Sequence, residues 1–114
     1  MKKGHYFGTE IDEKWWRRYR APGFFARGNG EFDLDAAGIH FKRKLADEPL
    51  LIGWNEITSA RLGKWHAGQW GSRRPVLKVA FDRGDLSLSA GFTLSPEWPE
   101  MEQLAADINT KASR

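Results

Sequence analysis

Apolar and polar residues alternate along much of the chain between residues 31 and 94, and this two-residue period constrains the fold more than any other feature. The period is clearest in LSLSAGFTL at 86–94, where one face would carry Leu86, Leu88, Ala90, Phe92 and Leu94. Successive side chains of a β-strand point to opposite faces, so the pattern predicts strands with one face in a core.

Shorter segments repeat the alternation and are separated by turn signals. The further predicted strands are EFDLD, IHFKRKL, LLIGWNEI, TSARLGKW and PVLKVAF, and the turns between them include DAAG, ADEP and DRGD. Gly91 would permit a bend that divides the last strand in two. The segments together predict six to seven antiparallel strands.

The period changes at both ends of the chain. In SPEWPEMEQLAADINTKAS, Ser95 can cap a helix that buries Trp98, Met101 and Ile108, with Leu104 or Ala105 beside them. In TEIDEKWWRRYR at 9–20, apolar residues recur every four positions, which predicts a second, short helix buried through Ile11, Trp15 and Tyr19.

The predicted fold is a single, mainly β domain over residues 1–114, because 114 residues suit one domain. A small antiparallel β-barrel or curved sandwich and its capping C-terminal helix would occupy residues 28–112, and an N-terminal helical arm residues 1–27. No apolar run approaches the roughly 20 residues of a membrane span, and the basic start MKK is not followed by the apolar stretch of a signal peptide. We therefore expect a cytoplasmic protein.

Composition and motifs argue against most catalytic chemistry. The chain has no cysteine, which excludes disulfides, thiolate metal sites and cysteine nucleophiles. His5, His40 and His66 lie in separate segments without metal-ligand spacing, and neither a nucleophile elbow nor a phosphate-binding loop is present. The sequence predicts no catalytic residue, metal site or cofactor. Glu56, after Trp54, is interpreted as the anchor of a strand end through a backbone N–H rather than as a buried acid.

The segment GKWHAGQWGSRRP at 63–75 gathers aromatic rings and cations without an acid. Flat rings stack and fixed cations pair with anions, so the segment predicts a contact surface on a hairpin spanning 61–74. Its candidate residues are Lys64, Trp65, His66, Trp70, Arg73 and Arg74, joined to the basic N-terminal segment. A second interpretation stays open, in which the two tryptophans cover a sheet edge and the arginines are solvated.

Trp16 is a separate candidate, because neighbouring helix residues face about 100° apart and Trp16 would lie beside the buried stripe. A partner protein or a second copy of the chain could use it, or it could pack on the barrel. The charge distribution is uneven: residues 1–30 are mainly basic, residues 61–74 carry only cations, and acids occur at Glu97, Glu100, Glu102 and Asp107. Such asymmetry can guide a partner, or it can reflect solvated faces.

The stretches GEFDLDAAGIHFKRK, LLIGWNEITSARL and PVLKVAF, with the terminal amphipathic helix, resemble bacterial pleckstrin-homology-like (GRAM-like) domains over about residues 28–112. The resemblance implies a bent antiparallel barrel closed by the C-terminal helix and a module that binds lipids, peptides or proteins. Members that bind phosphoinositides place basic residues in the loop between the first two strands. Here DLDAAGI is taken as that loop; it is short and acidic, so an anionic lipid fits the resemblance better than a phosphoinositide.

The sequence therefore favours a non-catalytic binding or interaction module with an unidentified ligand. We expect it to recognise an anionic peptide, protein or lipid head group through residues 61–74, and a homo-oligomer is a further expectation. Two alternatives stay open. A single-stranded nucleic-acid-binding protein would use the same residues and show steep salt dependence. A small enzyme would use His66 and a carboxylate in a deep pocket.

Overall fold

The computed structural model describes residues 2–21, 24, 27–44, 48–66, 69–70 and 74–112, and every structural statement below concerns these residues. Within them the chain forms ten strands and one helix. The strands are β1 (Lys2–Ile11), β2 (Lys14–Arg18), β3 (Gly28–Leu34), β4 (Gly38–Arg43), β5 (Leu50–Gly53), β6 (Ile57–Gly63), β7 (Trp65–His66), β8 (Gln69–Trp70), β9 (Val76–Arg83) and β10 (Leu86–Thr93), and the helix is α1 (Trp98–Ala112).

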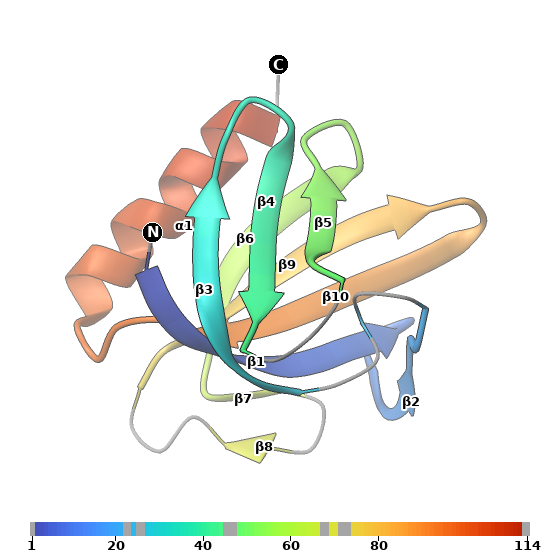
Figure 1. Ribbon diagram of the computed structural model, residues 1–114, viewed down its shortest axis with the longest axis horizontal. Helices are drawn as coiled ribbons and strands as arrows, with labels where there is room; N and C mark the ends of the chain where they lie inside the picture. The colour runs from blue at the N-terminus through green and yellow to red at the C-terminus, as the bar shows by residue number, and fades with distance from the viewer. Residues whose placement is uncertain are drawn as a thin grey trace.

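Eight of these strands form one antiparallel sheet in the order β5-β4-β3-β1-β10-β9-β6, with β2 added beside β1. The sheet curves so that β3, β4 and β5 lie in front of β6 and β9 (Figure 1). Its end strands β5 and β6 do not pair with each other, so the sheet is open. The prediction of a curved, mainly β fold is confirmed. A closed barrel of six to seven strands is wrong, because eight strands follow an open path.

The predicted N-terminal helix is wrong, because residues 9–20 belong to a hairpin of β1 and β2. The turn between the two strands is formed by Asp12 and Glu13, whose φ angles of 55° and 56° lie in the left-handed region that two-residue hairpin turns require. β1 pairs with β10 along one edge and with β3 and β2 along the other. Long-range pairing therefore satisfies this backbone as a strand and overrides the four-residue spacing of its apolar side chains.

The core lies between the two halves of the curved sheet. Phe92 is fully buried at its centre, with its ring centroid 5.2 Å from that of Phe32, 5.4 Å from Tyr6 and 5.5 Å from Phe41. Leu88 and Ala90 of β10 are also buried, as the alternation predicts, whereas Leu86 at the start of the strand is 37% exposed. On the opposite side of β10, Ser89, Gly91 and Thr93 are also buried, whereas Ser87 is exposed.

α1 packs along β6 at the open side of the sheet and buries Met101, Ala105 and Ile108, which confirms the predicted C-terminal helix. The expectation that Trp98 is buried is wrong, because this side chain at the start of the helix is 36% exposed. The Ser95 hydroxyl accepts a hydrogen bond from the Glu97 N–H at 3.1 Å, so Ser95 caps the start of the helix as expected. α1 is neither long enough nor apolar enough to span a membrane.

Side chains bond to backbone groups at the two unpaired edges of the sheet. On β6, the Asn109 side chain accepts from the Ala60 N–H at 2.8 Å and donates to the Ala60 carbonyl at 2.9 Å. On β5, Arg83 donates to the Leu51 carbonyl at 2.8 Å, and Glu56 accepts from the Gly53 N–H at 2.9 Å. The interpretation of Glu56 as a strand-end anchor is confirmed.

Candidate functional site

The segment between β6 and β9 forms a separate two-stranded ribbon of β7 and β8 below the main sheet (Figure 1). Trp65 pairs with Trp70 and His66 pairs with Gln69 across this ribbon. The backbone of residues 65–66 and 69–70 therefore forms the predicted hairpin, which is a separate two-stranded sheet. Arg73 and the side chains of Trp65 and Trp70 lie outside the described part of the structure.

His66 anchors the ribbon to the main sheet. Its side chain is fully buried, and its Nε2 donates a hydrogen bond to the carbonyl of Ser89 on β10 at 2.9 Å. Its Nδ1 lies 3.7 Å from Oε1 of Glu10 on β1, which is itself only 5% exposed. The ring occupies the space over Gly91, where an added Cβ would lie 2.4 Å from the ring Cδ2 atom. Gly91 thus provides the gap into which the ring fits.

The surroundings of His66 hold it in the neutral form. Burial, helped by the cations Lys78 and Arg61, lowers the pKa of His66 to about 4, against hydrogen bonds with the Ser89 and Gly8 backbone that oppose the shift. At neutral pH the ring is an uncharged anchor with no solvent-exposed surface. The sequence grouped His66 with the contact residues, but a substrate or partner cannot reach the ring in this arrangement.

The cations that flank the ribbon are solvent-exposed. Lys64 immediately precedes β7, and Arg74 lies just before β9. Arg61 on β6 is also exposed and donates to Oε1 of Glu13 at 2.7 Å, which ties β6 to the turn between β1 and β2. This ion pair brings Arg61 close to the turn of the N-terminal hairpin, and a shared contact surface of the two segments stays a prediction.

β2 contains a three-residue bulge. Ile11 pairs with Lys14 and the preceding residue Glu10 pairs with Arg18, so residues 15–17 have no partner on β1. Trp15 and Trp16 in this bulge are 52% and 62% exposed, and their rings meet edge to face at 5.8 Å. Exposure of Trp16 agrees with its choice as a surface candidate, whereas the prediction that Trp15 is buried is wrong because the bulge lifts it off the sheet.

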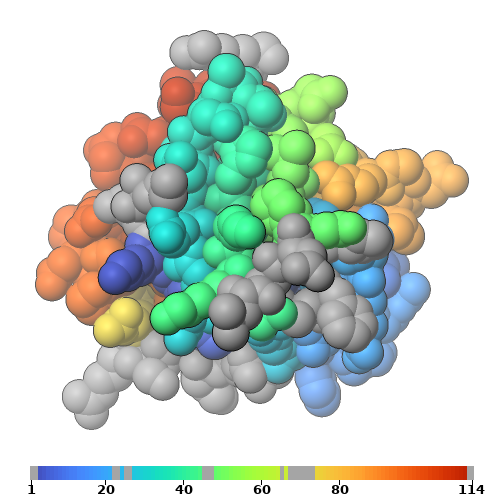
Figure 2. All heavy atoms as spheres, viewed as in Figure 1, coloured from blue at the N-terminus to red at the C-terminus, as the bar shows by residue number. Residues whose placement is uncertain are grey.

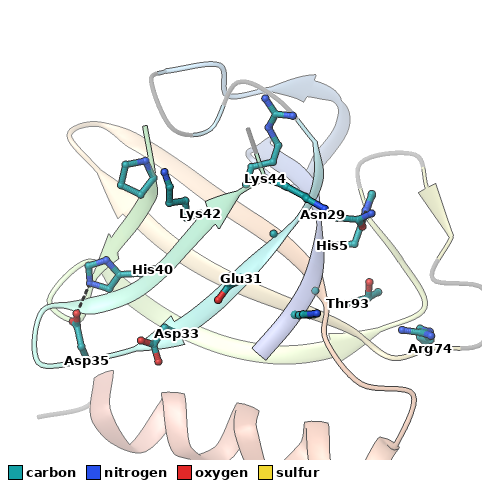
Figure 3. A pocket seen from close by; sticks show the side chains of 15 residues that line it. His5, Asn29, Glu31, Asp33, Asp35, His40, Lys42, Lys44, Arg74 and Thr93 are labelled. Atoms are coloured by element: carbon teal, nitrogen blue, oxygen red, sulfur yellow. Dashed lines mark hydrogen bonds and ion pairs between the residues drawn. The ribbon is translucent and has the colours of Figure 1, made fainter. Parts of the chain in front are cut away.

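A polar hollow that the sequence analysis did not predict lies on the outer face of β1, β3 and β4 and has a volume of about 960 Å³. In Figure 2 the side chains of β3 and β4, coloured cyan to green, cover much of the near face of the molecule. Figure 3 shows Asp33, Asp35 and His40 toward the α1 side of the hollow and His5 and Asn29 farther from it.

The polar groups of this hollow contact one another. His5 Nδ1 lies 2.9 Å from the Asn29 side-chain oxygen, and His40 Nε2 lies 2.8 Å from Asp35 Oδ2. The N–H of Ala37 and the neighbouring His40 lower the pKa of Asp35. Only the strand register creates this arrangement, so no sequence motif could have indicated it. Its lining carries the cations Lys3, Lys42, Arg43, Lys44 and Arg74 against the acids Glu31, Asp33 and Asp35.

Residues 1–106 match the family model described as Bacterial PH domain-like. The chain belongs to this family. The resemblance drawn from the sequence is therefore confirmed, but the match begins at residue 1, so the N-terminal segment expected to lie outside the resemblance is part of it. Neither a curated protein nor a solved structure matches the chain significantly.

The position of β1 also corrects the loop used to judge phosphoinositide binding. DLDAAGI at 33–39 lies between β3 and β4, not between the first two long strands of this PH-like sheet. The connection from β1 to β3 spans residues 12–27 and carries the acids Asp12 and Glu13 and the cations Lys14, Arg17, Arg18, Arg20 and Arg27. The loop in this position is therefore basic rather than acidic.

Proposed function

We propose that this bacterial PH-like domain is a non-catalytic binding module that recognises an anionic partner through residues 61–74. The partner would be a peptide, a protein surface or a lipid head group that presents carboxylate or phosphate groups. The observation that supports this most is the anchoring of the ribbon by buried His66, with Lys64 and Arg74 exposed on either side of it.

Anchoring matters because a fixed contact surface loses less conformational entropy on binding than a free loop does. His66 attaches the ribbon to β10 through Ser89 and sits close to Glu10 on β1. In this proposal Trp65 and Trp70 pack against the partner, while Lys64, Arg73 and Arg74 pair with its anions.

Positive charge accumulates around the proposed surface. Burial and the neighbouring Arg27 and Arg20 lower the pKa of Arg18, and burial and the nearby Arg61 lower the pKa of Lys78. Burial is the larger cause of both shifts, and the acids Glu10 and Glu13 oppose the shift of Lys78. The neighbouring cations, rather than the shifts, are what would attract an anion, over about 8 Å at physiological ionic strength.

The test compares the wild-type domain with Trp65→Ala/Trp70→Ala against three probes: phosphatidylcholine vesicles with phosphatidylglycerol or a phosphoinositide, fluorescent polyglutamate, and fluorescent oligothymidylate. Trp15→Ala/Trp16→Ala is the matched control, because it removes two tryptophans from a different surface. The expected result is binding of the wild type and the control to vesicles or polyglutamate, and at least tenfold weaker binding by the ribbon variant with an unchanged melting temperature.

Two outcomes would overturn this proposal. If the ribbon variant unfolds or melts much earlier, the two tryptophans cover the sheet edge and do not form a contact surface. If the domain binds oligothymidylate alone, with affinity that falls steeply as salt rises, it is a nucleic-acid-binding protein instead.

A further inference from the structure

The exposed tryptophan pair of β2 has no role in the proposed anion site. Trp15 and Trp16, at 52% and 62% exposure, are the most exposed large apolar side chains of the described residues. They lie on β2, which pairs with β1 alone, and the three-residue bulge interrupts any regular ladder along this edge. The bulge therefore disfavours the addition of a partner strand along β2, but it leaves both tryptophan rings free to contact another surface.

The charges beside these two rings are mainly positive. Lys14, Arg17 and Arg20 are exposed around them. Of the two nearby acids, Asp12 pairs with Arg17 at 3.2 Å and Glu13 pairs with Arg61 at 2.7 Å. The Trp bulge, defined as residues 14–17, is therefore an aromatic surface with a basic surround and fits an acidic partner.

The same chain carries a surface of that kind on its C-terminal helix. The acidic helix face, defined as Glu97, Trp98 and Glu102 at the start of α1, exposes both of its carboxylates, whereas Glu100 and Asp107 lie on the other flank of the helix. No lysine, arginine or histidine occurs between residues 95 and 110. Trp98, 36% exposed at the start of α1, provides an apolar ring among these acids. α1 and β2 lie on opposite sides of the molecule (Figure 1), so the two surfaces cannot meet within one chain.

We infer that the Trp bulge of one molecule docks on the acidic helix face of a second copy. Lys14 and Arg17 would face the helix acids, while Trp15 and Trp16 would pack beside Trp98. Because the two surfaces differ, the contact is head to tail: every bound copy still offers one free Trp bulge or one free helix face. Association therefore continues beyond a dimer into a ring or a chain. It should also weaken as salt screens the charges.

Sedimentation velocity over a range of protein and salt concentrations tests this inference with two variants. The head variant, Trp15→Ala/Trp16→Ala, lacks the bulge rings, and the tail variant, Glu97→Lys/Glu102→Lys, reverses charge on α1. Glu31→Lys/Glu48→Lys, which reverses two exposed charges outside both surfaces, is the charge-matched control. All substituted side chains are exposed, so each variant should melt near the wild-type temperature, which circular dichroism checks.

The wild type and the control should grow from monomer to dimer and larger species as concentration rises, and less so in high salt. Each variant alone should stay monomeric. Mixed together, the two variants should form dimers and nothing larger, because the intact bulge of the tail variant docks on the intact helix of the head variant. A wild type that is monomeric at every concentration overturns the inference, as does association that survives in either variant alone. A mixture of folded variants that stays monomeric overturns it too.

This inference and the proposed anion site fail separately. Loss of polyglutamate or vesicle binding in the Trp65→Ala/Trp70→Ala variant concerns only the anion site, and that variant should still self-associate. Should the wild type remain monomeric and bind phosphatidylglycerol vesicles through Trp15 and Trp16, the Trp bulge contacts a membrane and the second-copy inference is wrong.

Discussion

Asn109 replaces a missing strand at the edge of β6, and its removal should measure how much the open side of the sheet depends on α1. The Asn109 side chain makes hydrogen bonds of 2.8 Å and 2.9 Å with both backbone groups of Ala60, which is only 6% exposed. Losing two hydrogen bonds to a buried backbone costs about 2–3 kcal/mol. The higher helix propensity of alanine returns roughly 0.5 kcal/mol.

Asn109→Ala should therefore lower the free energy of unfolding by about 2 kcal/mol, which corresponds to a melting temperature about 8 °C lower for a domain of this size. Asn109→Asp should show a pH dependence. Its carboxylate can still accept from the Ala60 N–H but faces the Ala60 carbonyl, which raises its folded-state pKa. This variant should therefore become more stable relative to the wild type as pH falls and the acid gains a proton.

Urea denaturation followed by circular dichroism measures both effects. Gln103→Ala is the control on the exposed side of the same helix, where only a hydrogen bond to Asp107 is lost, and it should stay within about 0.5 kcal/mol of the wild type. An Asn109→Ala variant as stable as this control would refute the idea that the Asn109 amide completes the edge of β6.

Three further predictions concern His66 and the Glu56–Arg83 ion pair. Gly91→Ala places a Cβ 2.4 Å from the His66 ring and should lower the free energy of unfolding by about 2 kcal/mol. In a His66→Ala background the same change should lower it by less than about 1 kcal/mol, because the ring is gone. Equal losses in the two backgrounds would contradict this packing of His66 over Gly91. The folded pKa of His66, about 4, lies below its ordinary value of 6.5. The free energy of unfolding at pH 6.5 and above should therefore fall by about 3 kcal/mol as pH drops toward 4, because the unfolded chain binds a proton that buried His66 does not. Urea titrations of His66→Ala should show a weaker pH dependence. The same pH dependence in the variant and the wild type would contradict this role of His66. Glu56→Gln, which loses the charged partner of Arg83 at 2.8 Å, should cost about 1–2 kcal/mol at neutral pH. Arg83 and the Gly53 N–H hold the pKa of Glu56 below its usual value, so this difference should shrink in acid; a difference independent of pH would argue against the pair.

The hydrophobic periodicity predicted the structure best in segments that pack one regular face against the core. The buried Leu88, Ala90 and Phe92 of β10 and the buried face of α1 were predicted from period alone. The open sheet was not, because Arg83 bonds to the backbone of β5 and Asn109 to the backbone of β6, and both contacts join residues far apart in sequence. Periodicity cannot specify such contacts.

The N-terminal hairpin was mispredicted for a local reason. Ile11, Trp15 and Tyr19 have helical spacing, and the turn that breaks it uses Asp12 and Glu13 rather than the usual Asn-Gly or Asp-Gly. A non-glycine residue with positive φ, such as Glu13, gives little warning in a sequence.

The candidate site was predicted in part. The basic, tryptophan-containing segment is recognisable from composition, and its cations Lys64 and Arg74 are exposed. The burial of His66 could not be predicted, because it depends on the gap at Gly91 and the carbonyl of Ser89, more than 20 residues away in the chain. The polar hollow depends in the same way on the register of β3 and β4.

Mapping of backbone amide NMR shifts during titration with polyglutamate tests most directly whether the ribbon anchored by His66 is the anion-binding surface. If the ribbon binds the anion, the largest shifts should centre on residues 61–66 and 69–70, with smaller ones at Ser89 and Gly91 beneath the His66 ring. Shifts that instead centre on Glu31, His40 and Lys42 in the hollow, or that are absent at saturating probe, would contradict the proposal.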